Sequence, residues 1–197
     1  MSAPPPAGDD GFDDGFDDGP FADQPRDVPP DAVVAYAQAV TGAWICGMSG
    51  ELLAGLGAEP TDDLTSEFLS HLGTGELLAA ALASMLEWSV QAWRAARADG
   101  ADTDAFDDTV RSLDSVAKGL ATAISEAAAD DAVSALEGLY DVAREQAVEP
   151  FLLGEAMAEV TWRLVWLALD VGAGRRPWFS TLAVIDPRTP TPRATGD

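Results

Sequence analysis

The stretch PFLLGEAMAEVTWRLVWLALDVG, from Pro150 to Gly172, decides the fold. Apolar residues recur in it at spacings of three and four, which is the pattern of a helix that packs on a core. Other apolar residues widen this stripe around most of the circumference, which confines the polar side chains to one narrow strip: Glu155, Glu159, Arg163 and Asp170. Because a helix that is apolar on nearly every side needs neighbours on nearly every side, the sequence predicts that residues 150–172 form a central helix.

Helix breakers, capping residues and apolar periodicity predict further helices before this one. The first starts near Asp31 and breaks around Met48 and Ser49, after which a short helical turn follows. The others are expected at 60–72, at 75–98, at 104–124, and from Asp130 or Asp131 to just before Pro150. The sequence therefore predicts an all-α fold, a single helical bundle of five to six helices over residues 31–172.

The segments that flank this bundle differ from it in composition. Residues 1–30 contain the repeat DDGFDDGFDDG and seven prolines. They offer too little apolar surface to offset the entropy of ordering, and are predicted to form a disordered acidic arm. Residues 173–197 are predicted to be a short extended segment. Within it, the residues WFSTLAVI (178–185) have strand character. With no second strand to pair with, this stretch either lies in a groove of the bundle or adds to a partner's sheet.

The charge balance restricts the classes of partner. The 197 residues include 34 acidic and 11 basic ones, for a net charge of -23. Nucleic acids and anionic membrane surfaces would repel such a chain, whereas basic proteins or cations would attract it. The N-terminus has no signal-peptide pattern, and Arg163 interrupts the best candidate for a membrane-spanning run. We therefore expect a cytoplasmic protein with no membrane insertion.

The residue types that catalysis and metal binding require are scarce. Cys46 is the single cysteine, which excludes an internal disulfide, and its apolar surroundings predict a buried thiol. His71 is the single histidine, and no nucleophile motif accompanies it. The acidic residues between Asp99 and Asp108 lack the pattern of a calcium loop and are interpreted as a capped first helical turn. We expect no catalytic, cofactor or metal site, and no enzymatic activity.

The polar strip of the central helix allows two interpretations. Glu159 precedes Arg163 by four residues, so the strip is interpreted first as an ion-paired seam. In the alternative, Glu155 and Glu159 form the polar floor of a ligand pocket and Trp162 and Trp166 its walls. This alternative would make the chain a helical small-molecule or lipid-binding protein, and possibly an enzyme.

The two flanking segments contain aromatic residues that are candidates for binding a partner. In the arm, aromatic and acidic residues alternate, as in short binding segments: Phe12, Asp13, Asp14, Phe16, Asp17, Asp18 and Phe21. In the C-terminal segment, Trp178 and Phe179 follow a pair of arginines. The simpler interpretations are a solubilising tail for the first set and packing on the protein's own bundle for the second.

These observations favour a non-enzymatic protein-interaction module, either an adaptor or a sequestering or immunity-type inhibitor. Its acidic surface and aromatic tails would engage a protein partner that is basic or that has an apolar groove. Besides the ligand-binding alternative, a structural subunit of a larger assembly remains open, with contacts through residues 178–185. The sequence specifies no oligomeric state.

Overall fold

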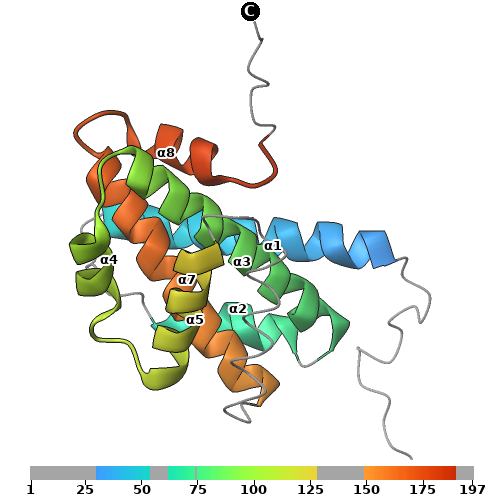
Figure 1. The fold of residues 1–197 in the computed structure, drawn as a ribbon. Helices are drawn as coiled ribbons and strands as arrows, with labels where there is room; N and C mark the ends of the chain where they lie inside the picture. Colours follow the sequence, from blue (N-terminus) through green and yellow to red (C-terminus); the bar gives the residue numbers. More distant parts are fainter. Residues whose placement is uncertain (1–29, 54–61, 74, 128–148, 190–197) are drawn as a thin grey trace, which may run out of the picture.

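The computed structural model describes residues 30–53, 62–73, 75–127 and 149–189. Within these residues every regular element is a helix (Figure 1), which confirms the all-α prediction. Seven helices are described, against the predicted five to six: α1 (Pro30–Leu53), α2 (Asp62–Leu72), α3 (Glu76–Ala98), α4 (Thr103–Val110), α5 (Ser115–Ala127), α7 (Pro150–Gly172) and α8 (Trp178–Ile185). The predicted arm and the helix predicted from Asp130 or Asp131 lie outside the described residues.

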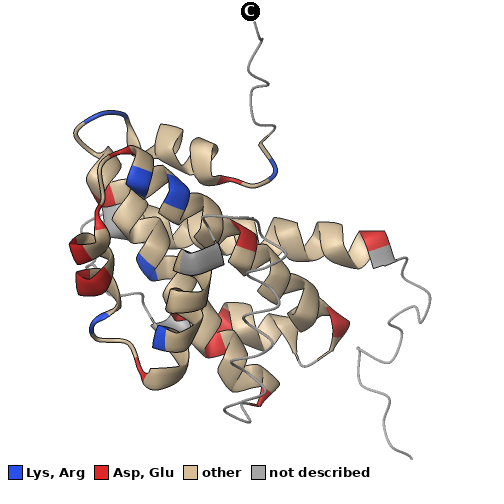
Figure 2. Ribbon diagram, viewed as in Figure 1, with Lys and Arg blue, Asp and Glu red and all other residues tan. Residues whose placement is uncertain are grey.

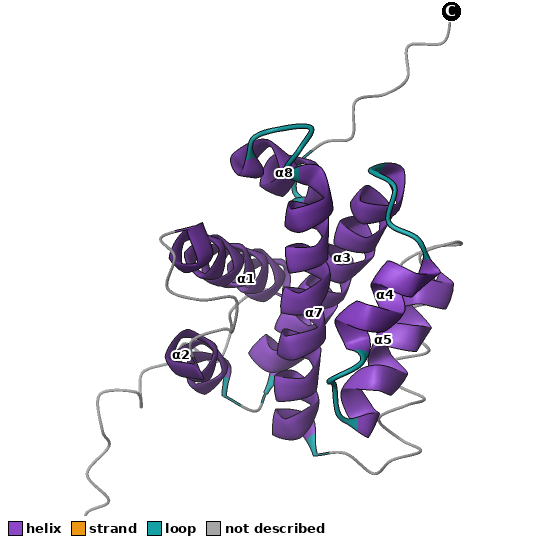
Figure 3. Cartoon of the chain, turned by 90° about the vertical axis from the view of Figure 1, so that its left-hand side faces the viewer, coloured by secondary structure: helices purple, strands orange, loops and turns teal. Residues whose placement is uncertain are grey.

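Helix α7 is central, with the bounds that the sequence predicts. Its first residue, Pro150, follows an extended N-cap residue, a position where the missing N–H costs no hydrogen bond. α7 contacts α2, α3, α4, α5 and α8, and packs most extensively against α3. In Figure 3, α3 and α7 lie in the middle, α1 and α2 on one side, α4 and α5 on the other, and α8 at one end. The core therefore forms around the α3–α7 pair.

A buried pair of hydroxyl groups links α3 to α7. The Ser89 and Thr161 side chains are fully buried, and the Ser89 hydroxyl lies 3.0 Å from the Thr161 hydroxyl. Each hydroxyl also lies within hydrogen-bonding distance of the carbonyl four residues earlier in its own helix, on Met85 at 2.8 Å and Met157 at 2.7 Å. Because both groups are satisfied without water, the core tolerates them, and they fix which turns of the two helices face each other.

Helix α1 continues through the predicted break, so that prediction was wrong. Ser49 is fully buried, and its hydroxyl donates to the Ile45 carbonyl at 2.8 Å inside the helix. This bond uses the side chain that was interpreted as a break signal. Among the described residues, α1 is also the helix that is long and apolar enough to cross a membrane, over Asp31–Gly50. This run was not predicted from the sequence. The core helices of globular proteins can be equally long and apolar, so the finding assigns α1 no membrane role.

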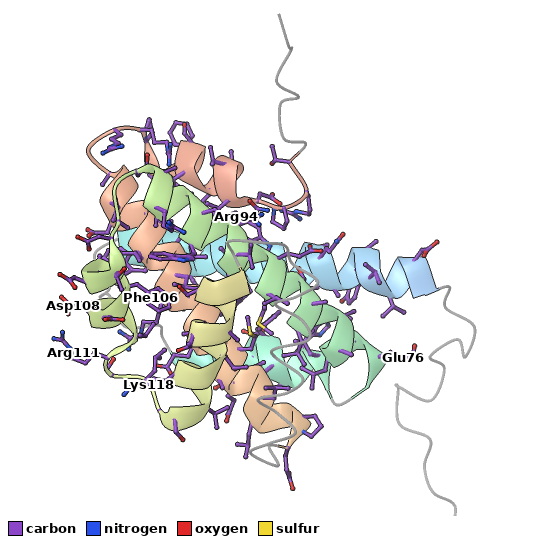
Figure 4. All side chains as sticks on the ribbon, viewed as in Figure 1. Glu76, Arg94, Phe106, Asp108, Arg111 and Lys118 are labelled. Carbon is purple, nitrogen blue, oxygen red and sulfur yellow. The ribbon has the colours of Figure 1, made fainter. Side chains whose placement is uncertain are left out.

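The helix predicted over 104–124 is two helices, α4 and α5. The Asp114 carboxylate accepts a hydrogen bond from the Ala117 N–H at 2.9 Å and so caps α5. The Asp102 carboxylate caps α4 in the same way through the Ala105 N–H at 3.0 Å. In Figure 4, Phe106 of α4 points toward the bundle, whereas Asp108 points away from it and forms an ion pair with Arg111. These carboxylates thus serve as caps and surface charges.

The prediction of strand character for residues 178–185 was wrong, because this stretch forms α8. A lone strand would leave its backbone groups unpaired, whereas a helix pairs them within the segment. α8 packs against α3 and α7 and buries Thr181, Leu182 and Ile185. The C-terminal segment thus adds a helix to the bundle, at the end shown at the top of Figure 1.

Candidate functional site

The predicted ligand strip on α7 contains side chains in different environments. Glu155 is exposed, Trp162 is buried and Trp166 is half-buried. The Glu159 carboxylate lies 3.5 Å from the Arg163 guanidinium, so the predicted ion pair is present. An ion pair at this partly exposed position stabilises the helix by less than about 1 kcal/mol. One of the two proposed floor carboxylates is therefore already paired within its own helix.

Helix α8 exposes the aromatic residues that were predicted to bind a partner. The exposed fraction is 40% for Trp178 and 59% for Phe179. Their rings meet edge to face, with centroids 6.1 Å apart and an interplanar angle of 81°. Val184 on the same helix is 56% exposed. α8 therefore buries one face in the bundle and presents other apolar side chains to solvent.

A buried carboxylate fixes the position of α8. Asp99, at the end of α3, is only 8% exposed and forms ion pairs with Arg175 and Arg176 in the loop before α8. The Arg176 Nε also donates to the Thr181 hydroxyl of α8 at 3.0 Å. The room for Thr181 comes from Gly172, where an added Cβ would lie 3.0 Å from this hydroxyl. The exposed aromatic pair is therefore carried by a helix that is held at a defined angle.

An apolar groove between α1 and α2 was not predicted from the sequence. Its volume is about 240 Å³, and its lining is predominantly apolar. Each helix supplies one stripe of residues at spacings of three and four: Val40, Ala43, Trp44 and Gly47 from α1, and Leu64, Glu67, Phe68 and His71 from α2. Helical spacing in the sequence predicts that both stretches are helices. That the two stripes face each other across an open groove depends on contacts between residues far apart in the sequence.

Contacts along the groove show that α1 and α2 run antiparallel. At one end an added Cβ on Gly47 would lie 3.8 Å from Leu64. In the middle the rings of Trp44 and Phe68 stack, with centroids 4.8 Å apart and planes 7° apart. At the other end the Tyr36 hydroxyl lies 2.7 Å from His71 Nε2. The hydrogen bond and the ring stack hold the two walls together.

The Asp, Glu, Lys and Arg residues of the two helices that form the groove are all acidic. The sequences of α1 and α2 contain no Lys or Arg and five carboxylates, Asp31, Glu51, Asp62, Asp63 and Glu67. Figure 2 accordingly shows no blue on these two helices. Among the described residues, the positive charges lie on α3, on α7, on the α4–α5 side and around α8.

Arg188 lies beside α1, on the side away from the groove. An added Cβ on Gly42 would lie 2.7 Å from the Arg188 guanidinium. Successive helix residues are about 100° apart, which places Gly42 and Cys46 opposite the Val40 stripe. Burial alone would raise the pKa of Asp186, but hydrogen bonds and the charge of Arg188 lower it, so this arginine is already paired. Cys46 itself is exposed, which corrects the predicted buried thiol.

Other predicted features lie outside these surfaces. The arm residues Phe12, Asp13, Asp14, Phe16, Asp17, Asp18 and Phe21 fall outside the described residues. In the part of the chain that the structure describes, no three His, Cys, Asp or Glu side chains are grouped to hold a metal ion. No family model, curated protein or solved structure that was compared with the chain matches it. The function is therefore argued from the geometry of these surfaces.

Proposed function

We propose that the protein is a non-enzymatic protein-interaction module, an adaptor or a sequestering inhibitor, that binds through α8. The observation that carries this proposal is the exposure of Trp178 and Phe179 on a helix that the ion pairs of Asp99 with Arg175 and Arg176 hold in place. We call these ion pairs the Asp99 clamp. Aromatic side chains of this size bring a large apolar area into a contact at little cost in conformational entropy, and Trp dominates many binding interfaces. Because the Asp99 clamp already fixes α8 in the free protein, binding costs little further conformational entropy in this helix.

The partner is expected to offer an apolar pocket for the aromatic pair and positive charge around it. The net charge of -23 repels acidic surfaces and attracts basic ones. The arm adds three more aromatic anchors, Phe12, Phe16 and Phe21, among paired aspartates. In this proposal the arm contributes a second, acidic contact to the same partner.

The ligand-pocket alternative on α7 is less well supported. Glu159 is paired with Arg163, and Trp162 is already buried in the protein, so neither is left for a ligand. Ligand binding would require these groups to be released. A thermal-shift screen in which a ligand stabilises the wild-type chain but not Glu159→Ala would restore this alternative.

The test compares two pairs of exposed apolar residues. A partner captured by the full chain is identified by mass spectrometry and purified, and its affinity is then measured by calorimetry. The variant with Trp178→Ala and Phe179→Ala is expected to bind at least about tenfold more weakly, because truncated anchors lose about 2 kcal/mol or more. The control, Phe151→Ala with Leu152→Ala, removes an adjacent apolar pair that is 39% and 54% exposed on α7.

Equal losses in the two double variants would refute the role of α8. Replacing Phe12, Phe16 and Phe21 together with Ala tests the arm separately in the full chain. If light scattering shows a wild-type oligomer that the Trp178/Phe179 variant converts to monomer, α8 joins copies of the chain. That result would favour the structural-subunit alternative.

A further inference from the structure

The shape of the α1–α2 groove fits a third helix. Its two walls are stripes of residues at helical spacing that run antiparallel. Ala43 and Gly47 are exposed in the α1 wall, where their small size would let another helix approach closely. The lining of the groove extends along α1 from Val40 to Gly47, which at 1.5 Å per residue is about 10 Å. About two turns of a helix would fill that length.

The apolar surface continues beyond the end of α2. Tyr36 is 47% exposed although its hydroxyl bonds to His71, and Val33, one turn earlier on the same side of α1, is only half-buried. Figure 1 shows these first turns of α1 extending past the other helices. An elongated apolar strip of this kind matches a helix better than a compact small molecule, which would need to be enclosed on most sides.

The charge on the two helices selects among possible occupants. They carry five carboxylates and no Lys or Arg, and Arg188, which lies beside α1, is on the far side and is paired with Asp186. The chain's own residues 1–29 contain eight Asp and one Arg, so like charge opposes their entry. A second copy of the chain meets the same repulsion. A helix that carries Lys or Arg beside its apolar face is attracted instead.

We infer that the α1–α2 groove is a docking site for an amphipathic helix of a basic protein partner. The apolar side chains of that helix, at spacings of three, four and seven, pack against the lining of the groove. Its flanking cations lie near the acidic residues of α1 and α2, of which Glu67 lines the groove. This site is separate from α8 and depends on the proposed function only in that both describe a protein-binding module.

The probe for this site is a synthetic helical peptide of three to four turns made of Leu and Lys, with Leu on one face. We expect it to bind the full chain in calorimetry, with an affinity that falls as salt is added. Two control peptides separate the contributions: a scrambled sequence has the same charge without the apolar face, and a Leu–Glu version has the face with opposite charge. Both are expected to bind at least about tenfold more weakly.

A matched pair of substitutions locates the binding site. Ala43→Leu places a bulky side chain in the groove, whereas Ala35→Leu places the same side chain at an exposed position of α1 that is about 80° around the helix from Ala43 and outside the lining of the groove. We expect Ala43→Leu to weaken binding by about tenfold and Ala35→Leu to leave it within about twofold. Thermal melts of both variants show whether the bundle is intact. A second pair tests the charge: Glu67→Gln should weaken binding more than Glu155→Gln, on exposed α7 surface.

Several results would overturn this inference. They are the absence of peptide binding, equal binding of the scrambled peptide, and equal effects of the two Leu substitutions. A tenfold gain in affinity on replacing Phe12, Phe16 and Phe21 with Ala would show that the arm fills the groove. A wild-type dimer that Ala43→Leu dissociates would show that a second copy fills it. Trp178→Ala is expected to leave peptide affinity unchanged, so failure at the groove and failure at α8 are distinguishable.

Discussion

Replacing Arg176 with Ala should destabilise the protein much more than replacing its neighbour Arg175. Arg176 pairs with the buried Asp99 and also donates to Thr181, which is 1% exposed. Both contacts involve the charged guanidinium, and a hydrogen bond to a charged group contributes about 1.5–3 kcal/mol. Because the Arg176 side chain is 27% exposed and Asp99 keeps Arg175 as a partner, we take the lower part of that range. The expected loss is about 2 kcal/mol.

Arg175→Ala serves as the control because this substitution removes the same charge from the same loop. Its side chain is 56% exposed and its nitrogen lies 3.5 Å from Asp99, so its pair is worth less than about 1 kcal/mol. Urea unfolding followed by tryptophan fluorescence gives both free energies of unfolding. For a chain of this size, a loss of about 2 kcal/mol lowers the melting temperature by about 4–8 °C.

Hydrogen exchange locates the effect. If Arg176 holds α8 in place, its loss should speed amide exchange in Trp178–Ile185 more than in the α3–α7 core. Equal costs for the two arginine variants, or unchanged exchange in α8, would refute the conclusion that this clamp positions α8.

Three further perturbations test the fold. Gly73→Ala should lower the free energy of unfolding by about 1 kcal/mol, because Gly73 has a φ of 63°. Gly50→Ala, inside α1 with open space around it, should instead raise the free energy of unfolding by up to about 1 kcal/mol, and thermal melts compare the two variants. Thr161→Val should cost about 1 kcal/mol, because Ser89 can still donate to Met85, and a double-mutant cycle with Ser89→Ala should give a coupling below about 1 kcal/mol. Burial raises the pKa of Glu87 from 4.5, so its stability contribution falls as pH rises through the folded-state pKa. Glu87→Gln should therefore stabilise the protein at neutral pH by less than about 1 kcal/mol, and have no effect well below pH 4.5, which urea unfolding at the two pH values measures.

The helices that the sequence predicts well are those whose ends and faces are both marked locally. Pro150 marks the start of α7 and Gly73 the end of α2, and in α7 the apolar residues widen the core stripe until one polar strip remains. The division between α4 and α5 was missed because Asp114 precedes Lys118 by four residues, the spacing of an ion pair within one continuous helix. Its carboxylate caps a new helix instead. An aspartate at this position can either begin an ion pair within a helix or cap the start of a new one. Only the path of the backbone distinguishes the two roles.

The error at α8 has a different origin. Its residues favour strands because β-branched and aromatic side chains suit a sheet surface, but that preference depends on packing against neighbouring strands. Here the neighbours are α3 and α7, and Arg176 reaches from the preceding loop to Thr181. The exposure of Phe179 and Val184 follows from this helical geometry, since a helix that buries Thr181, Leu182 and Ile185 must turn other residues outward. Trp178 lies on the same stripe as Leu182, but at the first residue of the helix, where it is still 40% exposed.

The α1–α2 groove could not be predicted because α1 carries almost no local signal of its orientation. Its sequence from Ala32 to Gly50 has no charged residue, so no polar strip distinguishes the face toward α3 from the face beside α2 or the face toward Arg188. Only the pairing of Trp44 with Phe68 and of Tyr36 with His71 shows which stripe forms the wall. Those contacts join residues far apart in the sequence.

Because most of α1 carries no charge, the groove itself does not discriminate between apolar partners, and the net charge of the chain has to do so. An exposed apolar strip attracts any other apolar surface, including the same strip on a second copy. With a net charge of -23, two copies repel each other over about 10 Å at ordinary salt, a distance comparable with the groove itself. A helix flanked by cations meets attraction where a second copy meets repulsion. Added salt weakens both effects, and should therefore reduce the preference for a basic partner over self-association.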